Sequence, residues 1–221
     1  TVVVLAVEGR PFQVVVPAQI CFSRGADGVV VRTDLKRINH LKGKILASSQ
    51  FTEADFFIRY LAQEANLGVN LLPNLSASPA PDKLNLVFCK DAFAAGDAFA
   101  RGLQSGQSPL AGCVTWAPKT TEVVADSQNR AHILATSRNL LIIADILIVN
   151  KGFAQQHPAK VLGLVDGLLE GNRRVREHPD THLETIGKAF KWDRTQVKAE
   201  LEKVHLSNLP ENLAFFSGAI A

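Results

Sequence analysis

The sequence lacks the charge pattern of proteins that bind nucleic acids or acidic membranes. Its lysines and arginines are spread among the acidic residues, and the formal net charge of the 221 residues is only +3. Electrostatic binding to a polyanion needs a basic block or a basic face. We therefore expect no nucleic-acid partner.

Long hydrophobic runs are also missing. The run over residues 140–149 is interrupted by Asp145 and has about half the ~20 residues that a membrane-spanning helix needs. The first residues, TVVVLAVEGRPF, lack the basic start and the small-residue cleavage site of a signal peptide. Neither export nor a membrane anchor can be predicted from these features.

Cysteine is scarce, and no metal-binding cluster is present. The 3 cysteines, Cys21, Cys89 and Cys113, lie far apart in apolar, strand-like runs, which favours buried free thiols over a disulfide or a nucleophile. His178 and His182 have helical spacing, but no third ligand accompanies them. We expect no metal and no cofactor.

The motifs of common enzyme classes are absent as well. The turn at residues 23–28 contains glycines, but it has neither the GxGxxG spacing of a dinucleotide-binding loop nor the GK[ST] of a phosphate-binding loop. No Gly-x-Ser-x-Gly elbow and no paired-acid or Cys/His arrangement stands out. The sequence therefore predicts no catalytic residues, and we expect a protein that is not an enzyme.

What the sequence does contain is an alternation of apolar runs and amphipathic helical patterns. The runs are continuous rather than alternating, which is typical of strands buried on both faces of a mostly parallel sheet. The predicted strands cover residues 2–7, 12–16, 28–32, 44–47, 84–88, 112–115, 132–135 and 143–149. The predicted helices cover residues 52–66, 91–103 and 118–125, with further helices after residue 149.

The change at residue 149 from strand–helix alternation to successive helices predicts two α/β lobes. Residues 44–140 form the second lobe in this interpretation, and residues 1–43 and 141–221 form the first lobe.

A polar cluster at residues 48–52 joins a predicted strand to a predicted helix. It contains Gln50, Phe51 and Thr52. Ligands of open α/β sheets bind outside the carboxyl ends of the strands, and the free N–H groups of a helix N-terminus suit an anion. The alternative is a plain capped turn.

Three further residues have two interpretations each. Trp116, which precedes Pro118 at a strand end, is either a cleft wall or a packed core aromatic. Arg24 either pairs with a carboxylate or sulfonate or lies in a solvated turn. Asp145 lies in an apolar run and as a buried carboxylate needs donors, either backbone N–H groups at a hinge or the ligand.

Three stretches together resemble one family. They are VVVRTDLKRINHLKGKILA (residues 29–47), CVTWAPKTTEV (residues 113–123) and the segment that begins ADILIVNKGF and continues to residue 190. They resemble the periplasmic solute-binding proteins of the sulfonate, taurine and nitrate importers, a family that includes the thiamine-pyrimidine-precursor binding proteins. The resemblance implies an α/β, two-lobed periplasmic-binding-protein-like fold of type II, with the ligand in the cleft between the lobes.

The resemblance also assigns residues. It implies that Gln50, Thr52 and Trp116 bind the ligand, and Phe51, which lies between the first two, is counted as a further candidate. Ser23 and Asp27 match the hinge-side segment of the family, and Asp145 matches the returning strand. Arg24 is a candidate from its place in the turn.

The same resemblance implies a biological setting. Family members carry a strand–helix–strand–helix section before the part that matches Thr1 and continue beyond residues 211–216, so we expect a fragment that lacks the first strands of the first lobe. The expected partners are a small polar ligand, most simply an organic anion, and the membrane permease of an ABC importer. We expect a monomer in the periplasm or outside the cytoplasm. The alternatives are an enzyme of the thiamine-pyrimidine-synthesis type and a ligand-sensing domain without transport.

Overall fold

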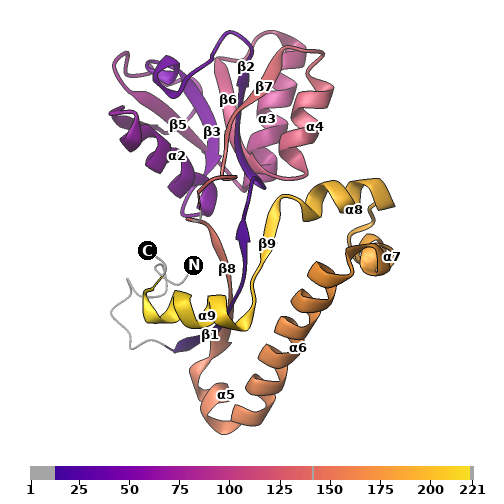
Figure 1. Ribbon diagram of the computed structural model, residues 1–221. Coiled ribbons are helices and arrows are strands. Elements are labelled where there is room, and N and C mark those ends of the chain that lie inside the picture. Colours follow the sequence, from indigo (N-terminus) through magenta and orange to yellow (C-terminus); the bar gives the residue numbers. More distant parts are fainter. Residues whose placement is uncertain (1–12, 141, 220–221) are drawn as a thin grey trace. The chain divides into compact units, whose positions relative to one another are not determined.

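The computed structural model describes residues 13–140 and 142–219 (Figure 1). The chain forms two compact units. The central unit comprises residues 25–139, and the terminal unit combines the described residues before Gly25 with those after Asn139. The strand predicted at residues 2–7 lies outside the described residues.

The central unit is built on a six-stranded sheet with the order β4-β5-β3-β6-β2-β7. Strands β4, β5, β3 and β6 run parallel to one another, whereas β2 runs antiparallel to both β6 and β7. In chain order the strands are β2 (Asp27–Arg32), β3 (Ile45–Ser49), β4 (Val69–Leu72), β5 (Leu84–Cys89), β6 (Leu110–Trp116) and β7 (Ala131–Thr136), with the 3-10 helix η1 (Ile38–Leu41) between β2 and β3.

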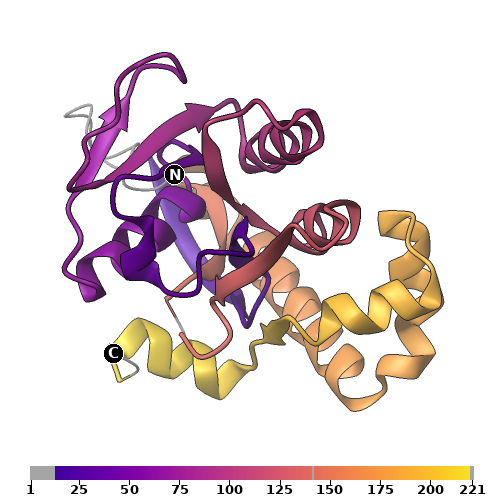
Figure 2. The same ribbon diagram turned by 90° about the horizontal axis from the view of Figure 1, so that it is seen from above.

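Helices cover both faces of this sheet (Figure 2). Alternate residues of a strand point to opposite faces, and Ile45 and Ala47 of β3 pack in one apolar cluster with Phe99 of α3. The other face receives α2, which buries Phe57 and Ile58. The helices are α2 (Glu53–Glu64), α3 (Ala92–Ser105) and α4 (Lys119–Asp126).

Local signals explain where α3 begins and ends. The Asp91 carboxylate accepts the backbone N–H of Ala94 at 2.7 Å, which satisfies one of the free donors at the helix start. Gly106 follows the last turn with φ +68°, a left-handed conformation that glycine adopts without a steric penalty. The predicted helix over residues 91–103 is therefore confirmed within two residues at each end.

The boundary of the central unit differs from the sequence prediction. Residues 25–43 belong to this unit, whereas the sequence pattern assigns them to the first lobe. The physical reason is the pairing of β2, which is hydrogen bonded on one side to β6 and on the other to β7. The short strand β4 was not predicted.

The terminal unit has a smaller, antiparallel sheet with the order β8-β1-β9. Its long helix α6 begins at Pro158, and Pro179 begins the next helix; proline at this first position loses no helical hydrogen bond. The elements are β1 (Val14–Ser23), β8 (Ala144–Asn150), α5 (Lys151–Gln156), α6 (Pro158–Glu177), α7 (Pro179–Phe190), α8 (Arg194–Leu201), β9 (Val204–Leu206) and α9 (Leu209–Ser217).

Buried amides connect the elements of the terminal unit. Asn212 accepts the backbone N–H of Gln19 at 2.8 Å and donates to the carbonyl of Gln19 at 2.9 Å. Asn172 of α6 donates to the carbonyls of Ile20 and Ser207 at 2.7 and 3.0 Å. These side chains tie β1 to the C-terminal segments.

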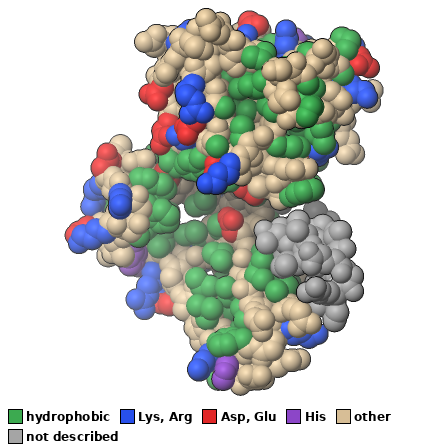
Figure 3. Space-filling model, turned by 180° about the vertical axis from the view of Figure 1, so that it is seen from behind, with side chains coloured by type: hydrophobic (Ala, Val, Ile, Leu, Met, Phe, Trp, Pro, Cys, Tyr) green, Lys and Arg blue, Asp and Glu red, His purple; other side chains and the backbone are tan. Residues whose placement is uncertain are grey.

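Large apolar side chains meanwhile remain on the surface of the terminal unit (Figure 3). The more exposed of them are Phe153, Leu162, Leu164, Phe190, Leu209, Leu213 and Phe216.

The strands form two sheets rather than one continuous sheet, as the predicted two-lobed α/β fold requires.

Candidate functional site

The carboxyl ends of three parallel strands meet at one edge of the central sheet. The register pairs Ser49 of β3 with Cys89 of β5, and β6 runs parallel on the other side of β3. Because β2 is antiparallel to β6, its first residue, Asp27, lies opposite Trp116 at the same edge. We call this region the central sheet edge; it comprises Asp27, residues 48–52, Lys90, Asp91, Thr115 and Trp116.

A hydrogen-bonded turn connects β3 to α2 at this edge. The Thr52 hydroxyl donates to the carbonyl of Ser49 at 2.9 Å, and the two hydroxyl oxygens are 2.7 Å apart. Since the single proton of Thr52 is already used, Ser49 donates to Thr52. Thr52 is the N-cap residue as predicted, but its side chain makes no cap hydrogen bond. Backbone N–H groups of the first turn of α2 therefore receive no hydrogen bond from the Thr52 side chain.

Buried hydroxyl groups without partners lie beside this turn. Ser48 and Thr115 are 0% and 1% exposed, and neither hydroxyl has a hydrogen-bond partner among the described residues. Ser48 lies on the face of the sheet opposite to Ala47, which is the face that α2 covers, directly before the start of that helix. A buried polar group without a partner carries a desolvation cost, which a hydrogen bond to a ligand or to water would remove.

Charged groups at the central sheet edge and in the adjoining first turn of α2 have opposing effects on an anion. Lys90 is exposed and follows Cys89, so the register places it level with Gln50, which is also exposed. In the first turn of α2, Asp55 is paired with Arg59 at 2.7 Å, while Glu53 adds a second carboxylate there. Lys90 is a candidate that the sequence analysis missed, and listing the residue after each predicted strand would have found it.

Trp116 is packed against a neighbouring aromatic ring without being fully buried. Its ring is half-buried and stands edge-on to Phe93 with ring centroids 5.6 Å apart. Lys119 lies over the same Phe93 ring at 5.6 Å. Glu122 hydrogen bonds to Lys119 and, together with Asp97, raises the pKa of the ammonium group. Trp116 is thus fixed by packing while part of its surface stays accessible.

Phe51 has an unusual conformation between Gln50 and Thr52. Its φ is +58°, a region that residues other than glycine, asparagine and aspartate seldom occupy. Its side chain is 71% exposed. The turn therefore displays an aromatic ring to solvent.

The other predicted site residues belong to the terminal unit. Ser23 is buried, and its backbone N–H donates to Ile143 at 2.9 Å; Arg24 is exposed. The interpretation of Asp145 as a buried carboxylate is wrong, because it is exposed on β8 and accepts a hydrogen bond from the Cys21 thiol at 3.0 Å. Burial and then the hydrogen bond to Asp145 raise the pKa of Cys21.

The prediction that the cysteines are buried free thiols holds in part. All 3 cysteines are free, but only Cys113 is buried, while Cys21 and Cys89 are half-buried. No group of three His, Cys, Asp or Glu residues that could hold a metal ion occurs within residues 13–140 and 142–219.

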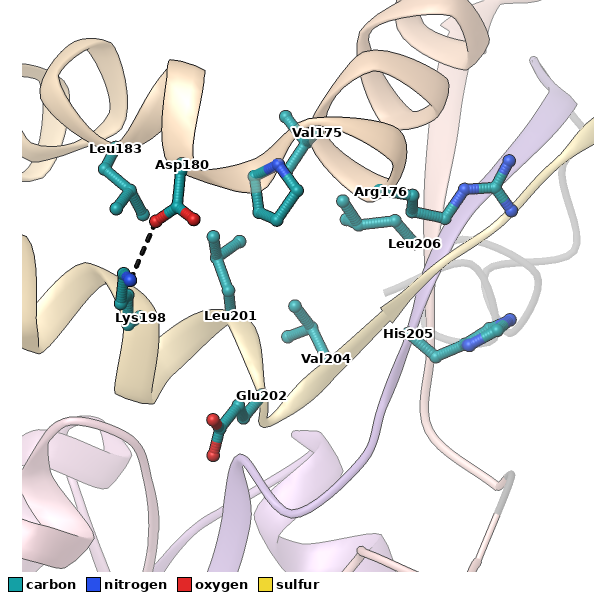
Figure 4. Close-up of a pocket in the computed structure, with 11 residues that line it drawn as sticks. Val175, Arg176, Asp180, Leu183, Lys198, Leu201, Glu202, Val204, His205 and Leu206 are labelled. Atoms are coloured by element: carbon teal, nitrogen blue, oxygen red, sulfur yellow. Dashed lines mark ion pairs between the residues drawn. The ribbon is translucent and has the colours of Figure 1, made fainter.

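A cavity of about 350 Å³ lies in the terminal unit (Figure 4). Leu183, Leu201 and Val204 give it apolar walls, and the ion pair between Lys198 and Asp180, 2.7 Å long, lies at one side. None of the predicted site residues lines this cavity. Gln50, Phe51, Thr52 and Trp116 lie instead at the central sheet edge.

Comparisons with known proteins found matches only among solved structures. No protein-family model and no curated protein sequence matches the chain. The periplasmic aliphatic sulphonate binding protein of Escherichia coli superposes with a TM-score of 0.63 at 12% identity, over 94% of this chain and 69% of that protein. This chain has the periplasmic-binding-protein fold. The predicted fold class is thereby confirmed.

Two further structures support the same fold. The alkanesulfonate-binding protein of Xanthomonas axonopodis pv. citri, bound to MOPS, matches with a TM-score of 0.59 at 14% identity, over 89% of this chain and 63% of that protein. A desulfurization enzyme matches with a TM-score of 0.61 at 15% identity, over 91% of this chain and 69% of the enzyme. The fold is thus shared by binding proteins and an enzyme.

The chain spans somewhat more than three fifths of these neighbours, from 63% to 69%. None of the helices in the described ranges has both the length and the apolar character needed to cross a bilayer.

Proposed function

We propose that this protein is the solute-binding component of an ABC-type importer and binds a small organic anion at the central sheet edge. The observation that carries the proposal is the buried hydroxyl of Ser48, which lacks a partner among the described residues and lies directly before the uncapped N-terminus of α2. A hydroxyl donor and free backbone N–H groups in one place suit an anionic group.

Other groups at the edge support an anion. Gln50 can donate through its amide, and Lys90 adds a positive charge level with it. Trp116 offers an apolar wall and an N–H donor. Thr52 acts differently from the sequence prediction, because its hydroxyl proton is used within the turn. Its contribution is to hold the turn that presents α2, while the backbone of the helix start donates.

The fold supports a role in transport. Two of the structures compared above are sulfonate-binding proteins, and another is described as an ABC transporter. From these we propose a membrane permease as the partner and a location outside the cytoplasm. Ser23, Arg24 and Asp145 belong to the terminal unit, and their part in ligand binding stays a prediction. The monomeric state likewise stays a prediction.

Calorimetry with methanesulfonate, acetate and methylammonium tests the proposal. We expect the two anions to bind and the cation not to bind. Ser48→Ala should weaken methanesulfonate binding by about ten- to a hundredfold, because a buried hydrogen bond to a charged group contributes ~1.5–3 kcal/mol. The matched control is Ser78→Ala, which removes an exposed serine hydroxyl and should leave the affinity unchanged. Binding of methylammonium alone would contradict the proposal.

An enzyme on this fold is the second candidate, favoured by the likeness to the desulfurization enzyme, which has also been determined in complex with biphenyl-2-sulfinic acid. Incubating the pure protein with a bound sulfonate or sulfinate and following the ligand by NMR distinguishes the two. We expect the ligand to remain intact. Turnover that a single substitution abolishes would establish the enzyme instead. A sensing role without transport would show ligand binding but no stimulation of a reconstituted permease.

A further inference from the structure

Resting on the proposed function, we infer that the central sheet edge selects anions whose charged group is attached to an aromatic ring, and that Phe51 and Trp116 form the two walls for that ring. The observations behind this inference are an exposed, conformationally strained phenylalanine and a half-exposed tryptophan packed on Phe93, which lie at the ends of two neighbouring strands of one sheet.

Phe51 has no evident role in stabilising the fold. A φ of +58° costs free energy for any residue with a Cβ atom, so glycine or asparagine would form the same turn at a lower cost. Its ring is 71% exposed and so gains little from burial within the protein. A position that is unfavourable in both respects indicates a function for the ring outside the folded core.

Trp116 supplies the second wall. The parallel pairing of β3 with β6 brings the end of each strand to the same edge, with Ala47 in register with Cys113. Continuing this register places Ser49 level with Thr115 and Gln50 level with Trp116, so that Phe51 directly follows the residue opposite Trp116. Contact with Phe93 holds the Trp116 ring, so little side-chain freedom is lost when a ligand packs against it.

The polar groups lie beside these aromatic walls. Gln50 directly precedes Phe51, Ser48 lies three residues before it, and Lys90 is level with Gln50. A ligand that reaches both sets of groups needs an anionic group bonded directly to a flat apolar ring. An arylsulfonate meets this description, whereas methanesulfonate engages the polar groups alone.

The test compares benzenesulfonate with methanesulfonate by calorimetry on the full chain. We expect benzenesulfonate to bind about tenfold more tightly, since stacking adds to the burial of the ring. Phe51→Gly should bring the affinities for the two sulfonates to within about twofold of each other, because it removes one aromatic wall and leaves the charge-assisted bonds in place. The same variant should raise the melting temperature, because glycine relieves the strain at φ +58°.

Phe56→Ala is the matched control. Phe56 is 50% exposed, but its ring stacks on Tyr60 further along α2, so the preference for benzenesulfonate should persist. Equal affinity of the two sulfonates, or an unchanged preference in Phe51→Gly, overturns the inference while the proposed function stands. Failure of both sulfonates to bind overturns the inference and the proposed function together.

Discussion

The two units of this chain are stabilised in different ways. In the central unit, Phe99, Leu46 and Val30 are fully buried between helices and a six-stranded sheet. In the terminal unit, buried amides connect β1 to α6 and α9, while leucines and phenylalanines stay exposed.

This difference indicates which substitutions should destabilise each unit most. An apolar core is sensitive to lost volume, because neighbouring side chains relax only partly into a cavity. A unit held by buried side-chain amides is destabilised when one amide is removed, because each lost hydrogen bond leaves a buried backbone group without a partner. The central unit also has a buried amide, Asn85, that bonds to Ala80 and Lys83, but it should respond most strongly to cavities, and the terminal unit to polar deletions.

The largest effect is expected from Phe99→Ala in the central unit. The side chain is 0% exposed, and its truncation should lower the free energy of unfolding by about 3–5 kcal/mol. Urea denaturation followed by circular dichroism measures the change. Leu213→Ala, at a site 65% exposed in the terminal unit, should change the value by less than ~0.5 kcal/mol. Similar losses in both variants would remove the distinction between the units.

A smaller effect is expected from Asn212→Ala in the terminal unit. It deletes bonds to the N–H and the carbonyl of Gln19, and we expect a loss of about 2–3 kcal/mol because both backbone groups stay buried. Hydrogen exchange should show faster exchange of the Gln19 amide with little change in the central unit. The control is Gln155→Ala at an exposed position of α5. A uniform loss of protection across both units would argue that they unfold as one.

The smallest effects concern Lys90 at the central sheet edge and Glu53 in the adjoining first turn of α2. Lys90→Gln should lower methanesulfonate affinity, and Glu53→Gln should raise it, each by about two- to fivefold, the size expected for a single charge near a helix N-terminus. Calorimetry at two salt concentrations measures both, since screening should reduce the differences. Lys198→Gln, in the cavity of the terminal unit, should have no effect. An effect of Lys198→Gln as large as that of Lys90→Gln would place recognition elsewhere.

The sequence predicts the central sheet well, because its strands are buried on both faces and read as continuous apolar runs. Strand β4 was missed because it has four residues, with Leu71 exposed and only Leu72 buried, so no clear apolar pattern marks it. Strand β9 has three half-buried residues and continues a segment predicted as helix. Short strands of this kind are fixed by their pairing partners rather than by their own pattern.

The candidate site was predicted in part for similar reasons. The position of residues 48–52 between a strand and a helix is visible in the sequence, and the structure places it at the carboxyl edge of the sheet. That Ser48 lacks a hydrogen-bond partner among the described residues depends on contacts across the fold, which no local pattern contains. Asp145 was misjudged because an apolar run need not be buried when its strand belongs to a small, three-stranded sheet that is partly exposed.

The two ends of the central unit touch each other. The backbone N–H of Gly25 donates to the Ser137 hydroxyl at 3.0 Å, and the Ser137 N–H donates to the carbonyl of Asp27 at 3.0 Å. Adjacent termini are the property that allows one domain to be inserted into a loop of another without separating the ends of that loop. By this geometry the central unit is an insertable module, suited to circular permutation or to transfer as a cassette into a different host protein.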